Sequence, residues 1–185
     1  QDFVELPSQI MEHWALEPEV LKSYAIHHDT GEPIPDELIG KLKTAQTFNQ
    51  GFATTEYLAA CYLDLAWHTQ TGKAPEDVDG FERKAMEDIH KIKMVDPRYR
   101  SAYFRHVFEG EHYSAGYYVY IWAEVLDADG FEAFKQKGIF DQETARSFRS
   151  NILEKGGTVP PMELYRKFRG RDPDVAPLLK NRGLI

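Results

Sequence analysis

The sequence has one cysteine, no long apolar run and no excess of positive charge, and each absence excludes a class of protein. Cys61 alone cannot build an intrachain disulfide framework, and its apolar neighbours indicate a buried thiol. No stretch is long and apolar enough to cross a bilayer, and no secretory leader is recognisable. A formal charge of −8 argues against nucleic acid as a partner, because phosphates attract basic surfaces. The clustered C-terminal charges indicate a solvated face: Arg166, Lys167, Arg169, Arg171, Asp172 and Asp174.

Helical periodicity extends over most of the 185 residues, enough chain for one domain with a substantial core. Proline, glycine and capping residues divide it into segments. Helices are expected at residues 7–14, 18–25, 35–47, 50–70, 76–91, 131–137, 141–155 and 161–168, with a short helix or loop at 101–108. Sustained apolar alternation with β-branched residues is missing, so a sheet would be at most a minor element. The expected fold class is all-α.

Polar residues mark several expected helix boundaries. Asn49 is expected to cap the helix at 50–70, and Asp141 the helix at 141–155. The sequence DADG at residues 127–130 is expected to interrupt or end the helix that precedes it.

The stretch HYSAGYYVYIW, residues 112–122, carries three tyrosines at helical spacing. If it is helical, Tyr113, Tyr117 and Tyr120 project from one face within an arc of about 60°. A phenol with a pKa of about 10 stays protonated at neutral pH, so it can donate to a developing oxyanion without bringing a charge. The alternative is packing, because aromatic stripes are mostly core, and the spacing by itself favours that alternative.

A second candidate for chemistry is DFVELPSQ at residues 2–9. Glu5 lies in an otherwise apolar setting just before an expected helix, where a carboxylate is costly to bury unless it is paired or bound to a metal. The alternative is an ordinary acid at a helix start, stabilised by the helix dipole.

The other histidines have plainer explanations. His13, His68 and His90 lie in helical, mixed surroundings and are expected to be structural or surface residues. A metal site built from His27, His28 and Asp29 in a polar loop is a further alternative.

Together these segments resemble the zinc metallopeptidase family of thimet oligopeptidase, oligopeptidase A and the peptidyl-dipeptidases, or dipeptidyl carboxypeptidases. The resemblance is carried by DFVELPSQIMEHW (2–14), TGEPIPDEL (30–38), HYSAGYYVYIWAEVLDADGF (112–131) and FRGRDPDVAPLLKNRGL (168–184). It covers essentially the whole chain, and the order of the segments is more specific than any one of them. The tyrosine stretch is most similar to the peptidyl-dipeptidase branch, whose members remove dipeptides from peptide C-termini.

The resemblance implies that residues 1–185 are the C-terminal helical part of a zincin-like oligopeptidase catalytic domain. Glu5 would be the third zinc ligand. The His-Glu-x-x-His helix that supplies the first two ligands and the general base does not occur in this sequence. We therefore expect the C-terminal portion of a longer enzyme that holds one Zn²⁺, and we expect this chain alone to bind no catalytic zinc and to be inactive.

The resemblance also assigns the tyrosines. By position, Tyr113 and Tyr120 match family tyrosines that donate to the oxyanion and the substrate, and Tyr117 matches a substrate-contacting neighbour. A family histidine that touches the substrate backbone best matches His106. The family's Gly-Gly before the first tyrosine corresponds here to GEH at residues 110–112, one residue longer. Whether His106 or His112 makes the contact therefore stays open.

The expected partners are short peptide substrates and the N-terminal part of the same protein. Apolar residues that this part normally covers would leave a patch through which the chain could self-associate. A cytoplasmic location is expected, with a periplasmic or exported one left open. The alternative function is a non-catalytic all-α interaction domain whose aromatic groove binds peptides.

Overall fold

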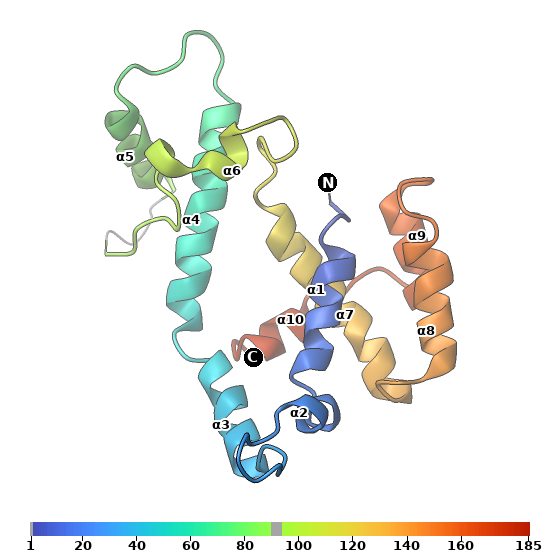
Figure 1. Ribbon diagram of the computed structural model, residues 1–185. Coiled ribbons are helices and arrows are strands. Elements are labelled where there is room, and N and C mark those ends of the chain that lie inside the picture. The colour runs from blue at the N-terminus through green and yellow to red at the C-terminus, as the bar shows by residue number, and fades with distance from the viewer. Residues whose placement is uncertain (1, 90–93) are drawn as a thin grey trace. The chain divides into compact units, whose positions relative to one another are not determined.

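In the computed structural model, residues 2–89 and 94–185 are described, and their regular secondary structure is almost entirely helical (Figure 1). The α-helices are α1 (Leu6–Ala15), α2 (Pro18–Tyr24), α3 (Asp36–Gln46), α4 (Gln50–His68), α5 (Val78–Asp88), α6 (Arg105–Phe108), α7 (Val119–Lys137), α8 (Gln142–Phe148), α9 (Pro161–Arg169) and α10 (Ala176–Asn181). A 3₁₀ turn, η1 (Ser101–Tyr103), and a π-helical stretch, η2 (Arg149–Leu153), complete them. Within the described ranges the β pairing is one isolated bridge, between Ile26 and Pro33. The prediction of an all-α fold is confirmed.

The described residues divide into two compact units. Unit 1 comprises residues 49–120. Unit 2 comprises residues 2–48 together with 121–185.

Unit 1 is built around α4, against which α5 packs. Its small core consists of Ala59, Leu63, Ala85 and Met86, with Ala66, Trp67 and Ile89 packed around it. Cys61 is free and buried, as predicted, and burial raises its pKa to about 11. The predicted cap of α4 is wrong, because Asn49 adopts a left-handed conformation, φ 55°, and its side chain makes no capping hydrogen bond.

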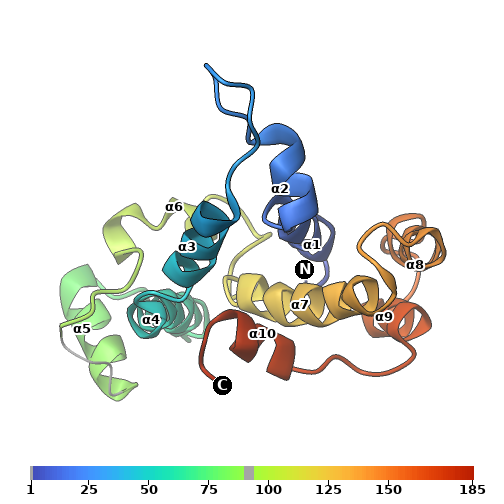
Figure 2. The same ribbon diagram turned by 90° about the horizontal axis from the view of Figure 1, so that it is seen from below.

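Unit 2 holds the larger core, made by α1, α7, α8, η2 and α9. Figure 2 shows α7 running between α1 and α10. The buried members of the core are Leu6, Ile10, Leu126, Phe131, Phe134, Phe148, Ile152, Leu164 and Tyr165. Asp141 caps α8 as predicted, because its carboxylate accepts the backbone N–H of Thr144 at 2.7 Å.

The predicted break at residues 127–130 is wrong, because α7 continues through it. Asp127 is held by a 2.7 Å hydrogen bond to Nε2 of His13 on α1. Gly130 permits a close approach of α7 to α1, since a Cβ at this position would lie 3.2 Å from Cδ1 of Ile10. Tertiary partners thus outweigh the low helix propensities of aspartate and glycine.

Unit 2 also contains an ionic network that includes two arginines of the predicted solvated face, Arg169 and Arg171. Asp129 on α7 is fully buried, and Tyr165 donates its hydroxyl to the carboxylate at 2.6 Å. Nε of Arg169 lies 3.2 Å from the same carboxylate, and Arg171 also pairs with it. Burial alone would raise the pKa of Asp129, but the hydrogen bonds from Arg169, Tyr165 and Arg171 lower it. The prediction of a solvated face is therefore wrong for Arg169, whose side chain is 8% exposed.

Candidate functional site

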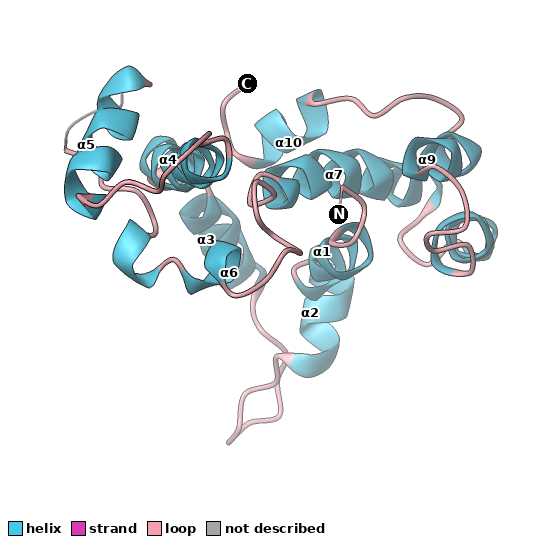
Figure 3. Ribbon diagram, turned by 90° about the horizontal axis from the view of Figure 1, so that it is seen from above, coloured by secondary structure: helices cyan, strands magenta, loops and turns pink. Residues whose placement is uncertain are grey.

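The tyrosine stretch is helical only from Val119 onward, so the prediction that all three tyrosines share one helix face is wrong. The residues before α7 form consecutive turns, and Figure 3 draws this part of the backbone as a loop. Ala115 has a left-handed φ of 54°, and Gly116 donates its N–H to the carbonyl of Tyr113 at 2.9 Å. A left-handed residue cannot continue a right-handed helix, and the turn therefore separates Tyr113 from Tyr120.

The turn nevertheless brings His106 and two of the tyrosines together. The rings of Tyr113 and Tyr120 are parallel to within 6°, with centroids 5.8 Å apart. The imidazole of His106 lies 4.5 Å from the Tyr113 ring centroid, and its Nε2 is 2.7 Å from the Tyr120 hydroxyl. His106 is exposed and both tyrosines are half-buried. We call His106, Tyr113 and Tyr120 the phenol cluster.

The phenol cluster can supply hydrogen bonds without a fixed charge. When the His106 Nε2 carries a proton, it donates to the Tyr120 oxygen, and Tyr120 can donate its own proton to a third group. With Nε2 unprotonated the direction reverses, and Tyr120 donates to His106. The histidine therefore orients the hydroxyl in either tautomer.

Tyr117 is buried, only 4% exposed, and packs against the phenol cluster, with its ring centroid 5.6 Å from that of His106 and 5.4 Å from that of Tyr120. Its ring centroid is 5.0 Å from that of Phe104 and 5.3 Å from that of Tyr57. Burial raises the pKa of Tyr117 to about 12, although a hydrogen bond with Arg98 opposes the shift. This placement favours a packing role, and the substrate contact expected for Tyr117 stays a prediction. His112 is exposed.

Asp64 fixes the turn between the tyrosines, a role that no sequence pattern predicted. It lies on α4 and is fully buried. Its carboxylate accepts the backbone N–H of Ala115 at 2.9 Å and of Tyr117 at 2.8 Å, and lies 2.7 Å from Nδ1 of His68. The available signal was an aspartate between two leucines in a helix expected to be mostly buried, where a carboxylate needs partners.

Glu5, the predicted zinc ligand, belongs to unit 2. It is half-buried at the start of α1, where its carbonyl accepts the N–H of Gln9 at 3.0 Å. Its side chain makes no capping hydrogen bond to the backbone, and the Ser8 hydroxyl lies 3.4 Å from Oε2. A carboxylate of this kind is a suitable zinc ligand, but a catalytic zinc site needs three protein ligands.

The loop that joins α2 to α3 gathers His27, His28 and Asp29. One ligand atom from each lies within 4.8 Å of the others, and all three residues are exposed. Nε2 of His28 is 3.1 Å from Asp29 Oδ2. Nδ1 of His27 accepts the backbone N–H of Asp29 and of Thr30, both at 3.3 Å, so this ring also organises the turn. The metal site considered for these residues stays a prediction.

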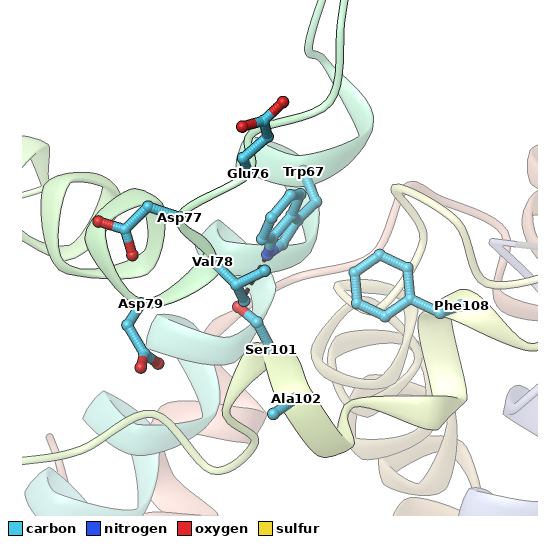
Figure 4. Close-up of a pocket in the computed structure, with 8 residues that line it drawn as sticks. All are labelled: Trp67, Glu76, Asp77, Val78, Asp79, Ser101, Ala102 and Phe108. Atoms are coloured by element: carbon cyan, nitrogen blue, oxygen red, sulfur yellow. Dashed lines mark hydrogen bonds between the residues drawn. The ribbon is translucent and has the colours of Figure 1, made fainter.

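Unit 1 also contains a cavity of about 580 Å³, drawn in Figure 4. It is lined by Trp67, Glu76, Asp77, Val78, Asp79, Ser101, Ala102 and Phe108. Trp67 donates its indole N–H to the Ser101 hydroxyl at 2.8 Å. Each acidic residue in the lining has a partner. Glu76 pairs with Lys73, Asp79 pairs with Arg100, and Asp77 accepts the N–H of Gly80 at 2.9 Å. The predicted site residues do not line this cavity, and we assign it no catalytic part.

The remaining histidines behave as expected where they are described. His13 and His68 each contact a buried aspartate and are structural. His90 lies outside the described residues. Across residues 2–89 and 94–185, the helices are too short or too polar to cross a membrane.

Comparison with known proteins identifies the family. The model of peptidase family M3 matches residues 1–184. A dipeptidyl carboxypeptidase of Escherichia coli (strain K12) is 43% identical over 100% of this chain and 27% of its own length. Oligopeptidase A of the same strain is 39% identical over 99% of the chain and 27% of its own length, and an organellar oligopeptidase A of Arabidopsis thaliana is 39% identical over 100% and 24%. The chain thus spans about a quarter of the length of these curated relatives. It belongs to peptidase family M3.

Proposed function

We propose that this chain is part of a zinc-dependent peptidase that hydrolyses short peptides and releases dipeptides from their C-termini. Family M3 is in general zinc-dependent, and the dipeptidyl carboxypeptidase of Escherichia coli is among the similar proteins. The observation that carries the proposal is the hydrogen bond of 2.7 Å between His106 and the Tyr120 hydroxyl, beside the stacked ring of Tyr113.

The phenol cluster suits the charge that peptide hydrolysis creates. When water adds to a peptide carbonyl, its oxygen becomes negative, and donors at about 2.7–3.1 Å lower the barrier. Tyr113 and Tyr120 are neutral donors at physiological pH, so they stabilise this charge without a strong interaction in the ground state. His106 orients the Tyr120 hydroxyl, and His106 or His112 contacts the substrate backbone.

Zinc, when bound, polarises the scissile carbonyl and lowers the pKa of a water molecule. Glu5 fits one position of such a site, because a carboxylate oxygen is a zinc ligand. The sequence contains no His-Glu-x-x-His motif. We propose that the other two ligands and the general base lie outside residues 1–185, and that this chain alone is inactive.

The test uses the full-length protein and three substitutions. We expect Glu5→Gln to remove both bound zinc and turnover, because the amide is a poor zinc ligand. Tyr120→Phe should leave zinc content intact and lower kcat about a hundredfold or more, the cost of one oxyanion donor. Tyr103→Phe is the matched control, because Tyr103 is in the same unit, 60% exposed and outside the phenol cluster. It should change neither quantity.

Zinc content by atomic absorption and steady-state kinetics on short peptides give the readouts. Mass spectrometry of the products should show C-terminal dipeptides, and amidation of the substrate C-terminus should slow their release. Normal zinc and turnover in Glu5→Gln would refute the metallopeptidase proposal. Cleavage at internal bonds alone, unaffected by amidation, would refute the dipeptide-releasing activity.

A further inference from the structure

One stripe of α4 faces the turn at residues 113–118, which we call the tyrosine turn. Tyr57, Cys61, Asp64 and His68 follow each other at spacings of four, three and four residues, which places them along one side of the helix. Tyr57 donates its hydroxyl to the carbonyl of Tyr117 at 2.7 Å. Asp64 accepts the N–H of the same residue at 2.8 Å. Both backbone polar groups of Tyr117 are therefore bound by side chains of α4.

Asp64 is an unusual choice for this position, because a buried carboxylate is costly unless several donors meet it. Here two backbone N–H groups donate to it, at 2.9 and 2.8 Å, and Nδ1 of His68 lies 2.7 Å from it while also contacting the Asp64 main-chain carbonyl at 2.9 Å. The two N–H groups belong to Ala115 and Tyr117, the residues on either side of Gly116. The carboxylate thus holds the turn through a long-range contact, because Asp64 lies 51 residues before Ala115 and 53 residues before Tyr117.

The turn needs an external clamp because its backbone is costly. Ala115 has a φ of 54°, and the left-handed region is unfavourable for a non-glycine residue because its Cβ crowds the neighbouring carbonyl oxygen. Gly116 is tightly enclosed, since a Cβ there would lie 3.3 Å from the carbonyl oxygen of Tyr113. The turn joins Tyr113 to Tyr120, so its conformation decides how the two phenols face each other.

We propose that Asp64 is a positioning residue for the reaction, acting through the Tyr113 and Tyr120 hydroxyls. This inference rests on the proposed function. Asp64 contacts neither substrate nor reacting atoms in this scheme. It holds the turn so that the phenols meet the oxyanion with the required geometry, where an error of about 1 Å can cost a hundredfold in rate.

The test variant is Asp64→Asn in the full-length protein. Asparagine keeps the shape but replaces one acceptor oxygen with an NH₂ donor, which would face a backbone N–H or the imidazole. We expect kcat to fall about tenfold to a hundredfold, with little change in KM and none in zinc content. The matched control is Glu82→Gln. Glu82 is another buried acid of unit 1 that accepts a backbone N–H, that of Ser101 at 2.7 Å, but it does not contact the tyrosine turn.

A double-mutant cycle separates positioning from general loss of structure. If Asp64 acts through the Tyr120 hydroxyl, its substitution should have almost no further effect on kcat in Tyr120→Phe. Amide exchange of the peptide covering residues 113–118, followed by mass spectrometry, should be faster in Asp64→Asn than in Glu82→Gln. His68→Gln keeps the carboxylate and removes one of its partners, and it should give a smaller fall in kcat that also vanishes in Tyr120→Phe.

The outcomes distinguish this inference from the proposed function. Equal falls in kcat for Asp64→Asn and Glu82→Gln would show a merely structural role and overturn the inference. The same follows if Asp64→Asn lowers kcat by the same factor in Tyr120→Phe as in the parent protein. If Asp64→Asn does not fold, the cycle with His68→Gln decides in the same way. If Tyr120→Phe itself keeps normal turnover, the oxyanion role of Tyr120 in the proposed function is refuted, whatever result Asp64→Asn gives.

Discussion

The two units each bury an aspartate on a long helix, and the two residues are satisfied in different ways. Asp129 in unit 2 and Asp64 in unit 1 are both fully buried. Asp129 is met by side chains, the guanidinium groups of Arg169 and Arg171 and the hydroxyl of Tyr165. Asp64 is met chiefly by backbone N–H groups of the tyrosine turn, with one histidine beside it.

This difference indicates that the two buried aspartates have different roles. The partners of Asp129 come from α9 and the segment that follows it, so the network ties the C-terminal part of the chain to α7. Asp64 instead fixes a turn whose left-handed alanine gives the phenol cluster its geometry. A buried acid therefore serves stability in one unit and local backbone geometry in the other. Substitutions in the two regions should separate loss of stability from loss of turnover.

The largest stability effect is expected for Asp129→Asn. It leaves the guanidinium of Arg169, 8% exposed, without its counter-charge, and breaking a buried pair in this way costs about 3–5 kcal/mol. Thermal unfolding of the full-length protein should show a lower Tm. The kcat per folded molecule should stay close to that of the parent, in contrast to Asp64→Asn.

Acid titration provides the internal control for this prediction. The hydrogen bonds of Asp129 lower its pKa in the folded state, so its stabilising effect is present above the ordinary aspartate pKa of about 3.9. That contribution is lost as pH falls below this value toward the folded-state pKa. The difference in Tm between parent and Asp129→Asn should therefore shrink on acidification. A difference that stays constant down to about pH 3 would contradict the assignment.

A smaller effect is expected from removing single hydroxyls in the two regions. Tyr165→Phe removes a donor from a fully buried carboxylate and should cost about 1.5–3 kcal/mol. Tyr117→Phe should cost about 0.5–1.5 kcal/mol, because Arg98 has a side chain 46% exposed and can be solvated instead. Thermal unfolding ranks the two, and kinetics on Tyr117→Phe tests its role. A large fall in kcat there would favour substrate contact over packing.

Local patterns were enough to predict most helices. Periodicity and caps gave the all-α class, the start of α1 after Glu5 and the cap of α8 by Asp141. The order of the quoted segments pointed to the family that the comparisons show. These features depend on residues close together in the chain, so sequence patterns record them.

The features that were predicted wrongly depend on distant partners. The spacing of the tyrosines predicted a helix, but Asp64, 51 residues before Ala115, holds a turn instead. Residues 127–130 predicted a break, but His13, from more than a hundred residues earlier, satisfies Asp127 within an intact α7. Arg169 looked solvated because its carboxylate partner lies 40 residues away. No local pattern contains these pairings.

The smallest effect is expected for Ala115→Gly, and the same substitution within α7 should act differently. Ala115→Gly relieves a left-handed alanine, but glycine also loses more backbone entropy on folding, so stability should change by no more than about 1 kcal/mol. Ala128→Gly, buried within α7, should cost about 1 kcal/mol in helix propensity and about 0.8 kcal/mol for the lost methyl group. Thermal unfolding of both variants gives the comparison. If Ala115→Gly destabilises the protein as much as Ala128→Gly, the turn carries no left-handed strain for Asp64 to hold.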